Sequence, residues 1–369
     1  MKILIAIDSF KGSLSSLQAE RAVYEGAMES GRVDRAICCP LADGGEGTSY
    51  ALSTIEGAQV VKTKAIDSLR REIECEYTIL PDNVAVIDVS QAVGLAMLKP
   101  SERNPLYTTT YGVGMLILDA LDRGCREFII GLGGSATNDC GIGMLSALGF
   151  EFSNCDPRAG AIALKSVMKI STENADTRLK ECKFHVACDV DNPLTGPRGA
   201  TYVFSPQKGA KEEDLEAMDK WHFRFATISK KYFEASDKTK GAGAAGGLGY
   251  AFLAYLGAEL KSGIDLVIEK TGIEEKIKEC DLVITGEGRL DSQTTGGKAP
   301  WGVSKLAKKY GKRVIALCGS IGANQEGLNT YIDCYLSIVS GPCTLDEAMD
   351  QFEAYENLKR TTKQLLSIL

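Results

Sequence analysis

In Glu127-Phe-Ile-Ile-Gly-Leu-Gly-Gly-Ser-Ala-Thr-Asn-Asp139, a short apolar strand leads into a glycine-rich loop that ends at an acidic helix start. The glycines allow a positive φ and a close approach of the backbone to a ligand. Ser135, Thr137 and the N–H groups of the following helix can donate hydrogen bonds to phosphate or carboxylate oxygens. The stretch therefore predicts an anion-binding loop, with an ordinary tight strand-to-helix turn as the alternative.

The same alternation of strand and helix continues in both directions along the chain. Residues 2–7 form an apolar run typical of a strand inside a parallel sheet. Residues 60–89 predict two or three strands with charges interspersed, as in the clean alternation of residues 72–77, and this change of composition predicts a domain boundary near residue 66. Further strands are expected at 37–41, 128–130, 183–187, 281–285 and 314–318, and helices at 16–29, 108–121, 139–148, 211–231, 299–309 and 345–368.

These elements predict an α/β protein of two domains, since 369 residues are many for a single core. The plain strand-helix rhythm of the beginning returns at the end of the chain. We therefore expect residues 1–65 and 261–369 to share one parallel sheet in a Rossmann- or flavodoxin-like domain. Residues 66–260 would form an inserted mixed α/β domain.

Composition excludes several classes of function. A net charge of −7 argues against nucleic acid as the main partner. The twelve cysteines include no Cys-x-x-Cys motif, so a disulfide framework or a zinc site is not expected. The chain shows no apolar run long enough for a membrane span, and we expect a cytoplasmic protein. With only two histidines, a general base is expected to be Asp, Glu or Lys.

Two short loops near the N-terminus combine charges with glycine. Residues 8–12 place an acid, a hydroxyl and Lys11 at a strand end, where α/β sheets bind ligands. Lys11 could hold a phosphate or carboxylate, or the loop could simply cap a helix. Residues 43–48 carry Asp43 and Glu46 among three glycines, which suits contacts to a metal ion or hydroxyl, or a helix start with favourably placed acids.

A pair of acids follows the strand at 183–187. Asp189 and Asp191 would point the same way if the strand continued, giving two carboxylates for a divalent ion or for removal of a hydroxyl proton. A turn made by Asp-Asn-Pro is the alternative.

The segment 285–298 is rich in glycine, hydroxyls and charge and follows the strand at 281–285. Arg289 and Lys298 could neutralise phosphate charge, and Glu287 or Asp291 could contact a metal ion. We expect a functional loop here.

Known nucleotide motifs match only in part. Gly131-x-Gly133-x-x-Ala136 and Gly241-x-Gly243-x-x-Gly246 resemble dinucleotide fingerprints, but the second has no strand before it and the first has no clear ribose-binding acid. An NAD-dependent hydroxy-acid dehydrogenase therefore stays an alternative. Neither Gly297-Lys298 nor Gly311-Lys312 completes a Walker A motif, so a kinase would hold ATP in another way.

Nine motifs in a fixed order span most of the chain: Asp8-Ser-Phe-Lys-Gly12, Ala42-Asp-Gly-Gly-Glu-Gly-Thr48, Arg103-Asn-Pro105, Thr108-Thr-Thr-Tyr-Gly112, Gly133-Gly-Ser-Ala-Thr-Asn-Asp139, Cys188-Asp-Val-Asp-Asn-Pro193, Pro206-Gln-Lys-Gly209, Gly241-Ala-Gly-Ala-Ala-Gly-Gly247, and Thr285-Gly-Glu-Gly-Arg289 through Gly297-Lys-Ala-Pro300. Together they resemble the type 1 glycerate kinases, the bacterial glycerate 2-kinase family. Cys140 and Ile7 depart from the glycine and proline usual there.

The resemblance implies an ATP- and Mg²⁺-dependent kinase with its active site in a cleft between two α/β domains. It would phosphorylate D-glycerate by in-line transfer with a carboxylate base, with 2-phospho-D-glycerate favoured over 3-phospho-D-glycerate. A non-catalytic sugar-acid or nucleotide sensor is a second alternative. We expect neither a nucleic-acid nor a membrane partner, and the protein could be a monomer or a homodimer.

The charges suggest roles for the candidate residues. The catalytic candidates are Asp189 as base with Asp191 second, and Lys11, Arg289 and Lys298 for the phosphoryl group. The substrate-binding candidates are Asp8, Ser9, Arg103, Asn104, Gly133, Gly134, Ser135, Thr137, Asn138 and Asp139. The nucleotide-binding candidates are Gly44, Gly45, Gly286, Gly288 and Thr294. The metal-binding candidates are Asp43, Glu46, Glu287 and Asp291.

Overall fold

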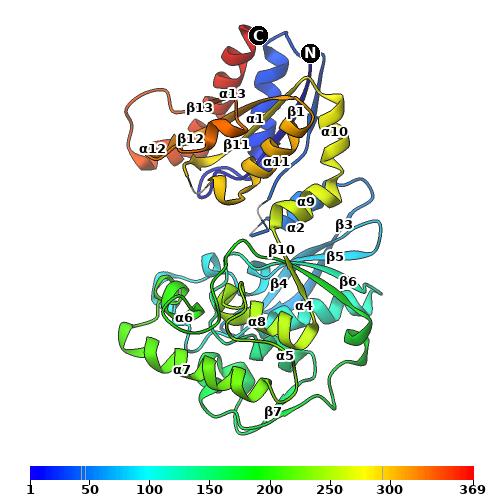
Figure 1. The fold of residues 1–369 in the computed structure, drawn as a ribbon, viewed down its shortest axis with the longest axis vertical. Helices are drawn as coiled ribbons and strands as arrows, with labels where there is room; N and C mark the ends of the chain where they lie inside the picture. Colours follow the sequence, from blue (N-terminus) through cyan, green and yellow to red (C-terminus); the bar gives the residue numbers. More distant parts are fainter. Residues whose placement is uncertain (43, 46, 293) are drawn as a thin grey trace. The chain divides into compact units, whose positions relative to one another are not determined.

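The computed structural model describes residues 1–42, 44–45, 47–292 and 294–369, which divide into two compact units (Figure 1). Unit 1 is formed by both chain ends, Met1–Asp43 and Ser262–Leu369, and unit 2 is Gly44–Lys261. The first division lies earlier than the boundary expected at residue 65. The reason is that β3 (Gln59–Ile66) is hydrogen-bonded into the sheet of unit 2 and the helix before it packs on the same sheet.

Unit 1 is built on a sheet whose described strands are all parallel and lie in the order β13-β12-β11-β1-β2. Counted along the chain within the unit, this is the flavodoxin-like order 2-1-3-4-5, as the sequence predicts. The strands are β1 (Lys2–Ile7), β2 (Arg35–Cys38), β11 (Leu282–Leu290), β12 (Arg313–Ile321) and β13 (Cys334–Ser337). The helices are α1 (Ser16–Glu29), α9 (Gly263–Thr271), α10 (Ile273–Glu279), α11 (Ala299–Lys309), α12 (Leu345–Met349) and α13 (Gln351–Ser367).

The core of unit 1 forms where α1 and α13 pack together against the sheet. Ile3, Ile5 and Ile7 of β1 are fully buried in this cluster. The next residue, Asp8, leaves the strand at its carboxyl end, so the buried strand fixes the position of the loop that follows it.

Two elements of unit 1 differ from the sequence prediction. Strand β11 runs on to Leu290, so the first part of the expected loop 285–298 is strand. The closing helix expected over 345–368 is two helices, because Asp350 is extended (ψ 129°) and its side chain accepts hydrogen bonds from Phe352 N and Glu353 N at the start of α13.

Unit 2 contains a mixed sheet in the order β10-β9-β6-β5-β4-β3 among the residues that are described. The four strands from β10 to β5 are parallel, and β4 and β3 add antiparallel strands at one edge. The strands are β3, β4 (Glu72–Ile79), β5 (Val84–Asp88), β6 (Glu127–Gly131), β9 (Lys183–Ala187) and β10 (Glu259–Lys261), with β7 (Glu151–Phe152) and β8 (Ile170–Ser171) as a separate pair. The helices are α2 (Thr48–Leu52), α3 (Ser90–Val93), α4 (Tyr111–Asp122), α5 (Ile142–Ala147), α6 (Ala200–Phe204), α7 (Glu212–Ser229) and α8 (Ala244–Leu256).

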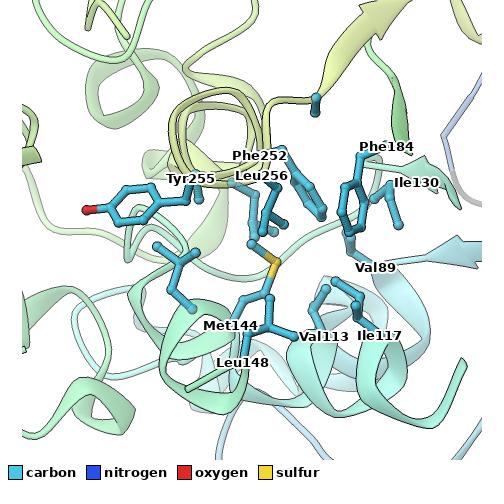
Figure 2. Packing of buried hydrophobic residues seen from close by; sticks show 14 of the residues in the cluster. Val89, Val113, Ile117, Ile130, Met144, Leu148, Phe184, Phe252, Tyr255 and Leu256 are labelled. Atoms are coloured by element: carbon cyan, nitrogen blue, oxygen red, sulfur yellow. The ribbon is translucent and has the colours of Figure 1, made fainter. Parts of the chain in front are cut away.

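The core of unit 2 joins helices α4, α5 and α8 to strands β6 and β9 (Figure 2). The rings of Phe128 and Phe184, from the two strands, stack with centroids 4.7 Å apart. Figure 2 shows Phe252 from α8 beside Phe184 and Met144 from α5 below them. This packing fixes both strands, and the loops at their carboxyl ends carry most of the candidate residues of the unit.

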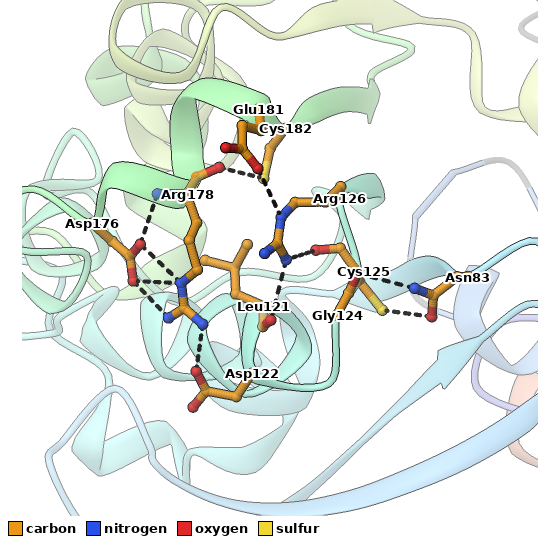
Figure 3. A network of polar contacts seen from close by, with 10 residues as sticks. All are labelled: Asn83, Leu121, Asp122, Gly124, Cys125, Arg126, Asp176, Arg178, Glu181 and Cys182. Atoms are coloured by element: carbon orange, nitrogen blue, oxygen red, sulfur yellow. Dashed lines mark hydrogen bonds and ion pairs between the residues drawn. The ribbon is translucent and has the colours of Figure 1, made fainter.

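Ion pairs hold the amino ends of the same strands (Figure 3). Arg178 donates to Asp176 and, at 2.7 Å, to Asp122 at the end of α4. Arg126, the residue before β6, donates to the carbonyls of Leu121 and Cys125. This network lies at the amino ends of the parallel strands, opposite the ends where α/β sheets bind ligands, and indicates a role in stability.

In the part of the chain that the structure describes, no helix has both the length and the apolar character needed to cross a membrane.

Candidate functional site

A pocket of about 360 Å³ lies in unit 1 beside β1 and β11. These two strands flank the point where the strand order reverses, which is where open α/β sheets bind ligands. The predicted residues Asp8, Ser9, Lys11, Glu287, Gly288, Arg289 and Lys298 all line it. The remaining wall is mostly apolar and comes from Phe10, Ile338, Val339, Leu345, Ala348, Met349 and Ala354.

The acid at the centre of the polar wall is Glu287, which is 6 % exposed. Its Oε1 accepts a hydrogen bond from the Thr294 hydroxyl at 2.7 Å, and its Oε2 pairs with Lys298 Nζ at 2.9 Å. Burial raises the pKa of Glu287, while the bonds from Thr294 and Lys298 act to lower it. The predicted nucleotide contact Thr294 is itself fully buried and holds this carboxylate in place.

The outer side of the same wall carries a second ion pair. Arg289 Nε lies 3.1 Å from Asp291 Oδ2, and the arginine side chain is 66 % exposed. Gly286 has a packing reason to lack a side chain, because a Cβ there would lie 2.0 Å from the Leu317 carbonyl oxygen of β12. Of the predicted segment 285–298, the pocket is therefore lined by one acid, Glu287, and by two cationic residues, Arg289 and Lys298. Asp291 is not among the lining residues and pairs with Arg289.

In unit 2 the ends of three parallel strands are aligned. Asp88 of β5 lies opposite Gly131 of β6, and Gly131 lies opposite Ala187 of β9. We call this line the carboxyl edge of unit 2. A Cβ on Gly131 would lie 2.7 Å from Asp88 Oδ1 and 3.0 Å from the Gly45 carbonyl oxygen, so only glycine lets the backbone of Gly44 and Gly45 approach here.

Asp88 is a residue that the sequence analysis did not select. It is 2 % exposed, and its carboxylate accepts hydrogen bonds from Gly47 N at 3.0 Å and from Ser49 N at 3.2 Å. It thereby holds the glycine loop at the start of α2. An acid at the end of the fully buried strand β5 was the available signal.

The loop Gly133–Asp139, called the 133–139 loop below, leaves β6 at the carboxyl edge. Asp139 is fully buried and accepts hydrogen bonds from Thr110 N and Thr110 Oγ1, both at 2.9 Å, and from Gly141 N at 3.1 Å. Burial raises the pKa of Asp139, and these donors act to lower it. Cys140 and Gly141 have positive φ, so α5 begins at Ile142 rather than at Asp139 as expected.

The second glycine motif packs directly on this loop. Gly246 has φ +67°, and a Cβ there would lie 2.0 Å from the Thr137 carbonyl oxygen. The next residue, Gly247, would bring a Cβ within 2.9 Å of Cys140 Cα, and Cys140 N donates to the Gly246 carbonyl at 3.0 Å. Gly246 of this partial dinucleotide fingerprint therefore makes room for the 133–139 loop, and the following Gly247 makes room for Cys140.

Lys208, to which the sequence analysis gave no role, contacts the 133–139 loop. Lys208 is 3 % exposed, and its Nζ donates to Ser135 Oγ at 3.0 Å and to the Thr137 carbonyl at 2.8 Å. Burial lowers the pKa of Lys208 to about 7. The following Gly209, at φ +91°, packs on Arg103, since a Cβ there would lie 2.2 Å from the Arg103 carbonyl oxygen. The motif Pro206–Gly209 was the sequence signal.

Comparison with known proteins agrees with this geometry. The glycerate kinase family model matches residues 3–369. The chain is 44 % identical to a glycerate kinase from Bacillus subtilis (strain 168), over 99 % of this chain and 97 % of that one. It is 41 % identical to the glycerate 2-kinase of Escherichia coli (strain K12), over 100 % and 98 % of the two chains.

The chain belongs to the glycerate kinase family. A crystal structure of a protein from Salmonella typhimurium LT2, assigned as glycerate kinase 2, matches this family member with a TM-score of 0.86 and 40 % identity, covering 100 % of this chain and 98 % of that one. The protein is therefore an enzyme of the kinase class, as the sequence predicts. None of these comparisons supports the dehydrogenase or sensor alternatives.

The remaining candidates of this glycerate kinase family member are placed as follows. Asp189 is exposed, two residues beyond the end of β9 at the carboxyl edge. Asp191 pairs with Arg198 Nη2 at 2.7 Å. Asn104 Oδ1 accepts from the Leu106 backbone at 3.1 Å. Two predicted metal ligands, Asp43 and Glu46, lie outside the described residues.

The structure thus gathers the predicted residues at two places. Within unit 1 they surround the pocket at the β1–β11 switch point, and within unit 2 they follow the carboxyl edge and the 133–139 loop. Of the predicted substrate contacts, Asp139 and Asn138 are fully buried, and Ser135 is 5 % exposed. The binding and catalytic roles of all these residues stay predictions.

Proposed function

We propose that this enzyme transfers the γ-phosphoryl group of ATP to a hydroxyl of D-glycerate, with Mg²⁺. The similarity along the whole chain to proteins named glycerate kinase carries this proposal. The name glycerate 2-kinase of the Escherichia coli relative favours 2-phospho-D-glycerate as the product over 3-phospho-D-glycerate.

The pocket of unit 1 suits the nucleotide. Its volume falls within the range of small-molecule sites, and one side is apolar, with Ile338, Leu345 and Met349 among its residues. Glycerate has an oxygen on each carbon and therefore has no apolar surface that could pack against this wall. A nucleotide base has such a surface. The phosphates would then face Lys11, Arg289 and Lys298 on the polar side. In this proposal Asp8 and Ser9, predicted to bind glycerate, lie near the phosphates instead.

The 133–139 loop and Arg103 suit the carboxylate of glycerate. Two buried atoms there, Thr137 Oγ1 and Arg103 Nε, have no hydrogen-bond partner among the described residues. Buried polar atoms are normally paired, so an unpaired donor in the loop and a second one on Arg103 support a ligand that supplies the missing acceptor. Asn104, next to Arg103, would complete the set.

Asp189 is proposed as the base that takes the proton of the attacked hydroxyl. It lies beyond β9 at the carboxyl edge, and β9 pairs with β6, the strand that leads into the 133–139 loop. Asp191 instead forms an ion pair with Arg198. A positioned carboxylate of this kind contributes about 10²- to 10⁴-fold to rate. Phosphoryl transfer depends mainly on positioning and charge neutralisation. The cationic side chains of Lys11, Arg289 and Lys298 in the unit-1 pocket would provide both.

The donor set also fits magnesium. Mg²⁺ is usually held by one or two carboxylates together with phosphates and waters. Asp8 and Glu287 are buried acids that line the pocket of unit 1. Asp291, also a predicted ligand, pairs with Arg289 of the same lining. Magnesium bound there would neutralise charge on the phosphates of ATP.

One assay tests the proposal. The protein is incubated with Mg-ATP and D-glycerate, ADP is measured, and phosphorus NMR identifies the phosphoglycerate isomer. We expect ADP and 2-phospho-D-glycerate in equal amounts, and no ADP when D-glycerate or Mg²⁺ is omitted. A change in nicotinamide absorbance with glycerate and no need for ATP would instead indicate the dehydrogenase.

A further inference from the structure

Lys208 is the buried cation that touches the 133–139 loop, and the proposed reaction gives it no role. We propose that Lys208 is a positioning residue for the substrate carboxylate: its ammonium occupies the acceptor side of the Ser135 hydroxyl, so that this hydroxyl donates its proton to the anion. The inference rests on the proposed function, in which the loop binds the carboxylate of D-glycerate.

The direction of one hydrogen bond carries the first step. When Lys208 is protonated, its Nζ can only donate, so Ser135 Oγ is the acceptor in their 3.0 Å contact. The single proton of the hydroxyl must then point elsewhere. No acceptor for it is found within the part of the chain that is described. Ser135 is 5 % exposed, so a small ligand at the loop surface can supply that acceptor.

The same ammonium fixes the backbone of the loop. It donates to the Thr137 carbonyl at 2.8 Å, and that carbonyl also lies against Gly246. The Thr137 hydroxyl is fully buried and has no partner among the described residues, which independently indicates a missing ligand atom. Gly209, the residue after Lys208, packs against the backbone of Arg103, the predicted carboxylate contact, so the turn at residues 206–209 contacts both the 133–139 loop and Arg103.

The charges around Lys208 leave room for an anion. Asp139 favours the ammonium, but its carboxylate already accepts hydrogen bonds from Thr110, Gly141 and Gly143. The other titratable neighbour, His222, is fully buried, and burial lowers its pKa, so it adds no charge at neutral pH. Burying an ammonium with one shared counter-charge is unfavourable, and a bound carboxylate would offset this.

The coupling between protonation of Lys208 and binding of D-glycerate predicts how the affinity for D-glycerate depends on pH. In the free enzyme Lys208 is partly neutral near its pKa of about 7, and a bound anion favours the ammonium. Binding of D-glycerate should therefore take up protons above pH 7. The binding contribution of the ammonium is fully present below pH 7 and weakens as pH rises above it.

The experiment measures binding and turnover on the full-length protein. Calorimetric titration with D-glycerate at pH 8, in two buffers of different ionisation enthalpy, should show proton uptake for the wild type. Lys208→Met should abolish the uptake and raise KM for D-glycerate about 10- to 100-fold, as for loss of a hydrogen bond from a charged group. KM for ATP should change little. Lys208→Arg should retain most of the affinity without proton uptake, because guanidinium stays protonated.

Two further variants separate positioning from folding. In a Ser135→Ala background, Lys208→Met should raise KM far less than in the wild type, because the hydroxyl that the ammonium orients is gone. Lys211→Met is the matched control: Lys211 lies three residues further along, is 73 % exposed and should leave KM and proton uptake unchanged.

Specific outcomes would overturn the inference. Two outcomes would reject the role of Lys208 and leave the kinase proposal standing, provided that the wild type turns over D-glycerate. One is that the wild type takes up no protons when it binds D-glycerate. The other is that Lys208→Met raises KM equally in the wild-type and Ser135→Ala backgrounds. If Lys208→Met fails to fold, the calorimetry of the wild type and of Lys208→Arg decides. Absence of D-glycerate turnover by the wild type rejects both proposals.

Discussion

Asp189 is the residue on which the proposed chemistry depends most. Asp189→Asn keeps the shape of the side chain and removes the base, so we expect kcat to fall by at least about 100-fold. Because Asp189 is exposed, Tm should not change. Steady-state measurement of ADP release checks this, with Asp191→Asn as a comparison that should lose less. A kcat near that of the wild type for Asp189→Asn would assign the base elsewhere.

A buried acid in unit 1 makes stability depend on pH. Glu20 of α1 is 1 % exposed, its Oε1 accepts from Cys39 N at 2.8 Å, and its Oε2 has no partner within the described residues. Burial raises the pKa of Glu20 from 4.5 to about 9. Between these pH values the unfolded chain releases this proton and the folded chain keeps it, so stability falls as pH rises.

Glu20→Gln should therefore raise Tm, by an amount that grows from pH 5 to pH 8.5. The glutamine can still accept the Cys39 hydrogen bond, but it cannot ionise in the unfolded chain. Thermal melts across this pH range test the expectation. Glu29→Gln, at the exposed end of the same helix, should not raise Tm, since Lys359 pairs with Glu29 and lowers its pKa. A constant difference between Glu20→Gln and wild type would contradict the assignment.

At the scale of elements, the two glycine segments of unit 2 depend on each other. Gly246→Ala adds a Cβ where the Thr137 carbonyl oxygen lies only 2.0 Å away, at φ +67°. Gly257 has a similar φ of +60° with nothing within 4 Å, so Gly257→Ala isolates the cost of the backbone conformation, about 1–2 kcal/mol. We expect Gly246→Ala to lower Tm by at least about 5 °C more than Gly257→Ala. Equal shifts in thermal melts would show that the contact is easily relieved.

Element positions also show how far sequence patterns reach. The helix at 16–29 and the strand at 183–187 occur with the expected bounds, because an amphipathic or alternating pattern is written in consecutive residues. The start of α5 and the division between α12 and α13 were missed. At both places an aspartate side chain, Asp139 or Asp350, bonds backbone groups and so competes with helix formation. The positive φ of Cys140 and Gly141 also prevents α5 from starting at Asp139.

At the scale of the whole molecule, the two units have separate hydrophobic cores, one drawn from each unit. Unit 2 is one continuous segment, so residues 44–261 expressed alone should fold and unfold cooperatively. Circular dichroism and thermal melting of this fragment test the expectation. Residues 1–43 and 262–369 should need a covalent linker to form the parallel sheet, because β1 lies between β2 and β11. A fragment 44–261 without a cooperative transition would contradict this view.

The sequence by itself determined the α/β class, the sharing of one sheet by both chain ends, and the strand-end loops that carry the candidate chemistry. These follow from local patterns and from the rule that parallel sheets bind ligands at their carboxyl ends. Only the tertiary structure showed that Asp88 accepts hydrogen bonds from Gly47 and Ser49 and that Lys208 contacts Ser135. Lys208 is 73 residues from Ser135 along the chain, and a contact over such a separation leaves no periodic trace in the sequence. The 133–139 loop is therefore visible in the sequence, and the buried ammonium that orients it is visible only in the fold.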